Sequence, residues 1–304
     1  MRLNLHLLRV FFTVAELRSF SRAAEALFIS QPAVSKAVRE LECQIGLPLL
    51  ERGAGGPKSA RGVQLTPDGA AVFEHARGIF ALERAAIEDV QARVGLQRGR
   101  LRVGASTTVG AYWLPQLLAD FVHRHPAVDV QVVQGNTQMV CEALLDCRID
   151  IGLVEGDVHD PRLAAHTWRE EPLCVVAGVH SPLARSRRLT AATLSSEIWL
   201  LREPGSGTRD VAHRLLHELA IRPQRCIEIG SNEGIARAVA AGLGVALLPM
   251  RVVRELLALR EVAALKLSGA PKLVRLLWRV ELKGRPPSPL VLAWREALAR
   301  PLAH

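Results

Sequence analysis

The sequence predicts an α/β protein with a helical N-terminal region and a larger C-terminal domain in which strands and helices alternate. The chain has 304 residues, a length that fits about two domains. Apolar residues recur at helical spacing up to about residue 93, whereas short apolar runs alternate with helical segments after residue 99. Gly95 and Gly99 separate the two regions, so we place a domain boundary there.

Composition and charge limit the class of protein. Apolar residues make up 49% of the chain, which excludes wholesale disorder. Neither a membrane-spanning stretch nor the apolar core of a signal peptide is present, so we expect a cytoplasmic protein with no membrane partner. The net charge of +9 favours a polyanionic partner, although only part of the basic excess lies in residues 1–65. Five dispersed cysteines fit reduced thiols, but Cys141 and Cys147 leave a redox pair open.

The N-terminal region first predicts two helices. Apolar residues at helical spacing, beginning with Leu5, predict a helix that ends near Leu17. A break at Arg18-Ser19-Phe20 follows. Ser21 is then predicted to cap a second helix that ends near Leu27.

A third helix is predicted to begin after Ser30, with Pro32 in its first turn, where a missing N–H costs nothing. Its apolar stripe is predicted to be Ala33, Val34, Ala37, Val38 and Leu41. Short helices joined by a turn, with a polar outer face on the third, describe a helix-turn-helix. The third helix would enter the major groove, where Gln31 can bond adenine, Ser35 either base, and Lys36 guanine or phosphate. An ordinary helical core with a solvated face is the alternative.

Residues 45–66 predict a wing, in which two short strands enclose a glycine-rich, basic tip that lies along the phosphate backbone.

Thr66 is predicted to cap a helix from about Pro67 to Arg93, whose apolar residues cover more than one stripe. Pairing with the same helix of a second chain would bury them, and packing within one chain is the alternative. The candidate DNA contacts are Ser21, Arg22, Gln31, Pro32, Ser35, Lys36, Arg39, Arg52, Lys58, Arg61 and Thr66.

The N-terminal motifs resemble a known signature. They are Ala23-Ala24-Glu25-Ala26-Leu27, Ser30-Gln31-Pro32-Ala33-Val34-Ser35, Leu41-Glu42, Gly46, Arg52 and Leu65-Thr66-Pro67-Asp68-Gly69. In density and order they resemble LysR-type transcriptional regulators. The resemblance implies a winged helix-turn-helix, a dimerising linker helix, double-stranded promoter DNA and RNA polymerase as partners, and a homo-oligomer of two or four chains. Leu50 departs from the family's usual Phe, and the segment 53–63 is longer than usual.

Residues 99–304 predict an α/β domain with mostly parallel sheets. The predicted strands are Leu101–Ala105, Val128–Val133, Ile149–Val154, Leu173–Ala177, Ile198–Leu201, Cys226–Ile229 and Val245–Leu248. The predicted helices lie near 110–123, 136–146, 207–220, 232–241 and 287–299. Polar residues follow the carboxyl ends of several strands, where open sheets of this kind bind ligands.

Those polar residues predict a site for a small anionic effector. Hydroxyls, amides and free backbone N–H groups at helix N-termini can hold an anion, and Arg202 and Arg209 can add charge-assisted hydrogen bonds. Simple helix capping is the alternative for any single residue. The candidate effector contacts are Ser106, Thr107, Thr108, Gly135, Asn136, Thr137, Glu155, Arg202, Glu203, Ser206, Gly207, Thr208, Arg209, Asn232 and Glu233.

The C-terminal region also resembles the effector domain of the same family, which has the fold of periplasmic binding proteins. Its loops at 202–209, 231–233 and 242–244 resemble the branch that includes regulators of carbon fixation and sulfur assimilation. The expected domains are 1–66 for DNA binding, 67–95 for the linker helix, and 99–304 for the effector, with one half at 99–170 and 271–304 and the other at 171–270. Crossings near Glu170-Glu171-Pro172 and Pro271 would make a hinge.

The sequence contains no recognisable catalytic set, so we expect no enzyme, cofactor or metal. Gly205-Ser206-Gly207-Thr208 lacks the pattern of a phosphate-binding loop, and Thr108 replaces the second glycine of a nucleophile elbow. His213 and His217 lie four apart on a predicted helix but lack the glutamate of a metalloprotease. The alternatives are an α/β enzyme with a basic N-terminal module and a solute-binding protein with a dimerising domain, and the missing signal peptide argues against the second.

Overall fold

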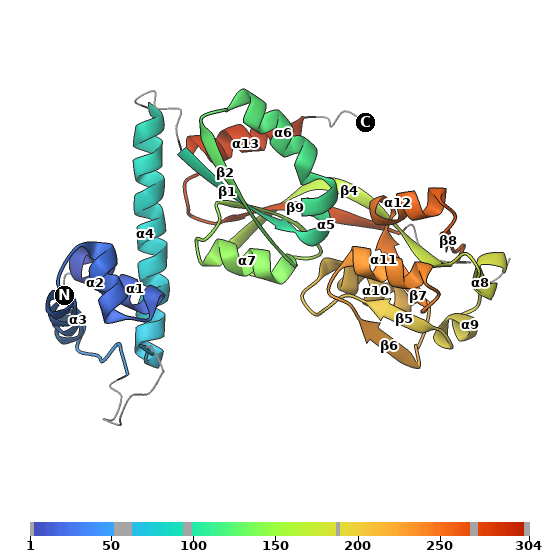
Figure 1. The fold of residues 1–304 in the computed structure, drawn as a ribbon, viewed down its shortest axis with the longest axis horizontal. Coiled ribbons are helices and arrows are strands. Elements are labelled where there is room, and N and C mark those ends of the chain that lie inside the picture. The colour runs from blue at the N-terminus through green and yellow to red at the C-terminus, as the bar shows by residue number, and fades with distance from the viewer. Residues whose placement is uncertain (1–2, 52–62, 94–98, 187–188, 268–272, 301–304) are drawn as a thin grey trace. The chain divides into compact units, whose positions relative to one another are not determined.

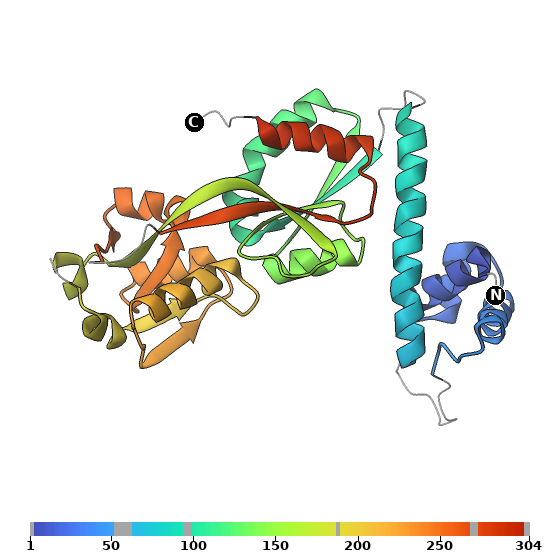
Figure 2. The ribbon, with the colours of Figure 1, turned by 180° about the vertical axis from the view of Figure 1, so that it is seen from behind.

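The computed structural model describes residues 3–51, 63–93, 99–186, 189–267 and 273–300. The chain divides into two compact units, Met1–Ile87 and Glu88–His304, which Figures 1 and 2 show from opposite sides. The first unit holds α1 (Leu5–Leu17), α2 (Phe20–Leu27), α3 (Gln31–Ile45) and most of α4 (Pro67–Arg93). These elements form the predicted helix-turn-helix and the long helix that follows it.

Local capping sets the bounds of the first three helices. Arg18 and Phe28 adopt the left-handed conformation and end α1 and α2. The cap of α2 is Ser19, whose hydroxyl accepts a hydrogen bond from the Arg22 amide, so the prediction that Ser21 caps this helix was wrong. The helix begins before Ser21, which is therefore exposed within its first turn. Ser30 caps α3 as predicted.

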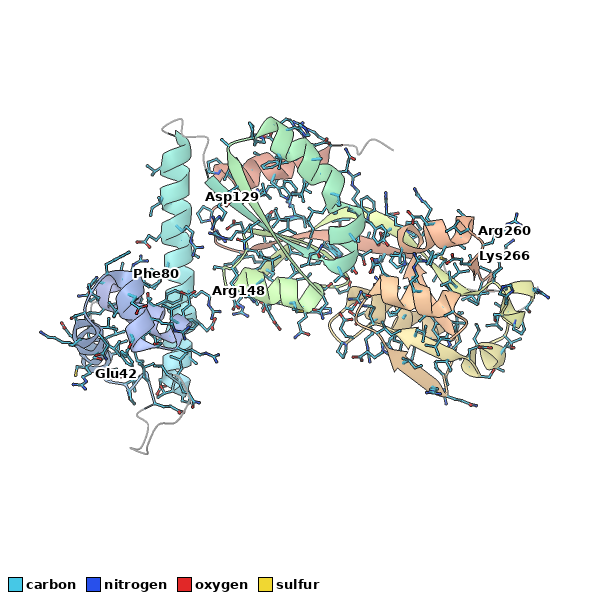
Figure 3. The ribbon with its side chains drawn as sticks, in the orientation of Figure 1. Glu42, Phe80, Asp129, Arg148, Arg260 and Lys266 are labelled. Atoms are coloured by element: carbon cyan, nitrogen blue, oxygen red, sulfur yellow. The ribbon has the colours of Figure 1, made fainter. Side chains whose placement is uncertain are left out.

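The core of the first unit joins α4 to the helix-turn-helix. The rings of Phe12 and Phe73 stack with centroids 5.0 Å apart, and Phe80, labelled in Figure 3, meets Phe12 edge-on at 5.4 Å. Two residues of the predicted apolar positions, Leu5 and Ala33, are exposed, and each lies in the first turn of its helix. The rest of the predicted α3 stripe is buried.

The predicted wing appears only in part. Leu50 and Leu65 form an isolated antiparallel bridge in place of two strands, and the glycine-rich tip lies outside the described residues. Glu42, labelled in Figure 3, positions the chain before this bridge, because its carboxylate accepts a hydrogen bond from the Leu49 amide at 2.8 Å. Thr66 caps α4 as predicted, since its hydroxyl accepts the Gly69 amide at 2.9 Å.

The second unit is an α/β domain with two halves. The described strands are β1 (Gly99–Ser106), β2 (Val128–Gly135), β3 (Ile151–Glu155), β4 (Leu163–Gly178), β5 (Ile198–Leu201), β6 (Arg225–Glu228), β7 (Val245–Pro249), β8 (Val262–Ala264) and β9 (Val274–Leu282). The described helices are α5 (Thr107–Tyr112), α6 (Leu114–Arg124), α7 (Thr137–Leu145), α8 (Pro182–Arg185), α9 (Ala191–Ser195), α10 (Gly207–Glu218), α11 (Asn232–Ala240), α12 (Met250–Ala258) and α13 (Pro289–Ala299).

The expectation of mostly parallel sheets holds only for the described strand pairs that involve neither β4 nor β9. The pairs β1–β2, β1–β3, β5–β6 and β5–β7 are parallel, whereas every described pair that involves β4 or β9 is antiparallel. β9 was not predicted from the sequence, because charged residues interrupt its apolar pattern. β8, α8, α9, α12 and the first part of β4, before Leu173, were not predicted either. The predicted helix at 110–123 is two helices, α5 and α6, with Trp113 between them.

The strands β4 and β9 connect the halves (Figure 1). β4 pairs with β9 from Leu163 to Pro172 and then with β7 from Leu173 onwards. β9 in turn pairs with β3 of the first half. Core clusters cover both faces of each half, with α6 and α13 on one face of the first half and α7 on the other. α10 and α11 cover opposite faces of the second half.

Candidate functional site

The N-terminal end of α3 presents an exposed polar surface. Gln31, Pro32, Lys36 and Arg39 are exposed, and Ser35 is half-buried. The Gln31 amide donates a hydrogen bond to the Ser35 hydroxyl at 3.0 Å, so these two predicted base contacts already align with each other. The arrangement offers donors and acceptors of the kind that read base edges in a major groove.

The other predicted DNA contacts differ in their exposure and in their hydrogen bonds within the protein, and three of them lie outside the described residues. Ser21 and Arg22 are exposed on α2, and the Arg22 guanidinium donates to the Leu17 carbonyl. The Thr66 hydroxyl donates to the Pro48 carbonyl at 2.7 Å, so a phosphate would have to compete with that bond. Arg52, Lys58 and Arg61 lie outside the described residues.

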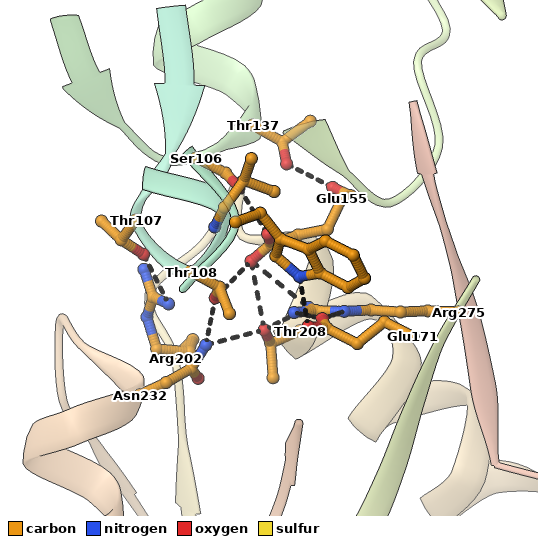
Figure 4. Close-up of polar contacts among 12 residues, drawn as sticks. Ser106, Thr107, Thr108, Thr137, Glu155, Glu171, Arg202, Thr208, Asn232 and Arg275 are labelled. Carbon is orange, nitrogen blue, oxygen red and sulfur yellow. Dashed lines mark hydrogen bonds and ion pairs between the residues drawn. The ribbon is translucent and has the colours of Figure 1, made fainter. Parts of the chain in front are cut away.

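In the second unit, three of the predicted effector residues converge on the buried carboxylate of Glu155, which was itself predicted (Figure 4). The Ser106 hydroxyl donates to one carboxylate oxygen, and the Thr108 hydroxyl donates to the other at 3.0 Å. The Thr208 hydroxyl lies 3.5 Å from the same oxygen as Thr108. Helices α5 and α10, from opposite halves, thus direct their first-turn hydroxyls at one side chain.

Asn232 completes this cluster from the start of α11. Its amide nitrogen donates to the Thr108 hydroxyl at 2.8 Å and to the Thr208 hydroxyl at 3.2 Å. Both threonine hydroxyls donate their single proton to Glu155, so they must accept from the Asn232 amide. The predicted anion cradle therefore already holds an anion that belongs to the protein, the Glu155 carboxylate.

Sequence analysis missed two charged residues beside this carboxylate, Arg275 on β9 and Glu171 on β4. Both are buried. The Arg275 guanidinium lies 3.2 Å from the Glu155 carboxylate and donates to Glu171 at 2.9 Å and to the Thr208 hydroxyl at 2.7 Å. Glu171 also accepts the Trp113 indole N–H at 2.9 Å. The signal available in the sequence was an arginine inside the largely apolar run Val274–Leu282.

Arg202 is also buried, and its partners span both halves. Its guanidinium forms two hydrogen bonds with the carboxylate of its neighbour Glu203, at 2.7 and 2.8 Å. It also donates to the Thr107 hydroxyl of the first half at 3.2 Å. The Asn136 amide of the first half donates to Glu203 at 3.3 Å. Burial acts to raise the pKa of Glu203, but the bonds and charge of Arg202 outweigh burial and hold that pKa below its usual value.

The remaining predicted residues surround these groups. The Thr137 hydroxyl donates to the backbone carbonyl of Glu155, and Arg209 donates to Glu228 at 2.8 Å. A Cβ at Gly207 would lie 2.1 Å from the Glu155 carbonyl oxygen, so the close approach of α10 to β3 requires glycine there. Gly135, at the end of β2, is similarly crowded by Met139.

Some polar atoms of this region have no hydrogen-bond partner among the described residues. They include the Ser206 hydroxyl at the cap of α10, Oδ1 of Asn232 and one carboxylate oxygen of Glu233. Burial and the nearby Glu233 carboxylate raise the pKa of Tyr112 to about 12, so this phenol stays protonated at neutral pH. The site as a whole is a polar network in which nearly every charge is matched within the protein.

The redox pair left open for Cys141 and Cys147 is not favoured by the chemistry of Cys141. Burial raises the pKa of both Cys141 and Cys174 to about 11, so the reactive thiolate is scarce in both. We expect Cys141 and Cys174 to react with a thiol-specific disulfide reagent at least about 100-fold more slowly at pH 8 than the exposed Cys43 and Cys226. Equal labelling of all five in denaturant is the control. A rapid Cys141–Cys147 disulfide on mild peroxide treatment would contradict this expectation.

The part of the chain that the structure describes can be compared with the requirements of a metal site and of a membrane-spanning helix. No three His, Cys, Asp or Glu side chains there gather in a way that could hold a metal ion. His213 and His217 lie on α10 without a third ligand. None of the described helices combines the length and apolar character needed to cross a bilayer.

Comparisons with known proteins cover nearly the whole chain. Residues 5–70 match the family described as bacterial regulatory helix-turn-helix protein, lysR family, and residues 95–303 match the family described as LysR substrate binding domain. The chain is 33% identical over 296 residues to the RuBisCO operon transcriptional regulator of Allochromatium vinosum, covering 97% of this chain and 95% of that protein.

Two solved structures share the fold. The regulatory domain of Synechocystis PCC6803 CcmR, in complex with 2-PG, matches with a TM-score of 0.60 and 27% identity, covering 66% of this chain and 96% of that one. Full-length CbnR, complexed with its target DNA, matches with a TM-score of 0.64 and 23% identity, covering 97% of this chain and 98% of that one. The folds of both units therefore occur together in the single chain of full-length CbnR.

Proposed function

Because the chain belongs to the LysR family of DNA-binding transcriptional regulators, we propose that it contacts promoter DNA through the N-terminal end of α3 and adjusts those contacts when a small anionic effector binds between the halves of its second unit. Membership in this family makes the protein a regulator, which excludes the enzyme and solute-carrier alternatives. The exposed Gln31, Lys36 and Arg39 support the DNA-binding part.

One observation carries the effector part: the Arg202 guanidinium is held by Glu203, its own neighbour in the chain. The Glu203 carboxylate makes the bidentate hydrogen bonds to the Arg202 guanidinium that a carboxylate or phosphate of a ligand would make. Glu203 is partly exposed, so it can turn to water when it is displaced. Glu155, by contrast, is buried and saturated with donors, and we assign it a structural role as the fixed anion of the cluster.

Displacement of the Glu203 carboxylate would change hydrogen bonds in both halves of the second unit. The carboxylate accepts from Asn136 of the first half, so its departure releases a contact that joins the halves. While it binds the anion, Arg202 would still donate to the Thr107 hydroxyl of the first half, and that hydroxyl has its own proton left to donate to the anion. The ligand therefore favours a different angle between the halves, and by linkage it changes the state that binds DNA.

The regulator is further proposed to act as a dimer or tetramer that engages RNA polymerase at the promoter. Leu82, Ile87 and Val90 of α4 are exposed apolar residues. Burying them against the same helix of a second chain would remove their surface from water and would supply the two-fold symmetry that a near-palindromic DNA site requires.

The effector proposal is tested by thermal unfolding in the presence of small carboxylates and phosphate monoesters, each paired with a neutral analogue of similar size. We expect an anion at 100 times its Kd to stabilise the parent chain by about 2.7 kcal/mol. Arg202→Met is expected to weaken binding of that anion at least about 30-fold, because the bidentate contact is lost. Arg202→Lys should retain part of the affinity.

Arg225→Met is the matched control, since Arg225 is exposed on β6 and lies outside the proposed site. The melting temperature of each variant without ligand separates lost binding from lost stability. Stabilisation by the neutral analogues to the same extent, or full anion affinity in Arg202→Met, would contradict the proposal.

A further inference from the structure

The turn between α2 and α3 exposes an aromatic ring. Phe28 is 95% exposed, more than any other large hydrophobic residue in the described part of the chain. Its backbone has φ +56°, a left-handed conformation that a residue with a Cβ adopts at a cost and that glycine or asparagine adopts more readily. In the free chain the ring is not buried, so no packing contact offsets the cost of the left-handed backbone or of the apolar surface exposed to water.

The position of Phe28 is fixed by the helices on both sides. Its backbone N–H donates to the Glu25 carbonyl at 3.2 Å and closes α2, and Ser30 caps α3 two residues later. Gln31, the first residue of α3, is exposed on the same turn. In a helix-turn-helix the N-terminal end of the recognition helix enters the major groove, so the residues just before it meet the edge of that groove.

We propose that Phe28 is a DNA contact whose ring packs against apolar surface of the duplex. This inference rests on the proposed role of α3. The ring would recognise apolar C–H surface, which duplex DNA offers as the C5-methyl group of thymine in the major groove and as the deoxyribose of the backbone along the groove edge. Ile29, also exposed, extends the apolar tip. Contact with DNA would bury the ring in the complex, where it stabilises binding without adding charge.

Phe28→Asn tests the proposal, because asparagine suits the left-handed conformation and removes the ring. The probe is a duplex whose binding site is recovered by selection from genomic DNA, titrated at several salt concentrations. We expect the affinity for this duplex to fall about tenfold with an unchanged dependence on salt, since no phosphate contact is lost. The melting temperature of the free protein should not fall. Phe28→Gly should behave in the same way.

Replacement of each thymine in the site by uracil then distinguishes the two surfaces. A position where uracil weakens the parent chain but not Phe28→Asn identifies a thymine methyl, and the absence of such a position identifies deoxyribose. Equal affinity of Phe28→Asn and the parent chain overturns the inference, as does a loss of affinity that follows a lower melting temperature. Failure of the parent chain to bind any duplex would instead overturn the proposed role of α3.

Discussion

The Arg275→Met variant is expected to unfold with a free energy about 3–5 kcal/mol below that of the parent chain. Arg275 is buried and bonds Glu155, Glu171 and Thr208 at once. Its removal leaves Glu171 as a buried carboxylate whose remaining hydrogen-bond partner among the described residues is the Trp113 indole. An unpaired buried charge is costly because it has lost both water and its counter-ion. For a unit of this size the melting temperature should fall by about 6–20 °C.

A second substitution tests the cause. Glu171→Gln removes the stranded charge but keeps an oxygen for the Trp113 indole, so the double variant Arg275→Met/Glu171→Gln should recover at least about half of the lost stability. Arg275→Lys keeps a positive charge without the planar fork and should fall between the parent chain and Arg275→Met. A double variant no more stable than Arg275→Met would mean that packing of the arginine stem, and not charge pairing, accounts for the loss.

The N-terminal region was largely predictable because its determinants are local. Ser30 and Pro32 act within one turn of α3, and the buried Val34 and Leu41 lie on a single helical face. The errors there were also local. Ser19 and Ser21 are equally good caps by residue type, and the choice between them depends on where Arg18 ends α1.

The effector region was predictable only as a set of loops. The sequence places polar residues after strands, but it does not say which of them the protein uses itself. Glu155 takes the hydroxyls of Ser106 and Thr108, which sequence analysis assigned to a ligand. The pair Arg275–Glu171 joins residues 104 positions apart, across two strands whose pairing no local pattern specifies. Contacts of that kind arise from the tertiary fold.

The second large effect is expected at the DNA surface. Gln31→Ala should weaken binding to the specific site by about 1–3 kcal/mol, or roughly 5- to 150-fold, and leave affinity for random DNA nearly unchanged. The Gln31 amide is exposed and needs only to leave the Ser35 hydroxyl to form two hydrogen bonds with an adenine edge. It carries no charge, so the dependence of binding on salt should stay the same.

Arg52→Ala is the contrasting variant, because the sequence predicts a phosphate contact for this residue. It should weaken specific and random DNA alike and reduce the slope of log affinity against log salt by about one. The measurement is a footprint on the DNA upstream of the protein's own gene, followed by titration of the protected site and of random competitor. Two protected half-sites spaced by whole helical turns are expected for a two-fold dimer. Equal losses on specific and random DNA for Gln31→Ala would show that Gln31 supports the fold or the phosphate contacts, and base recognition would then have to come from Ser35 and Lys36 alone.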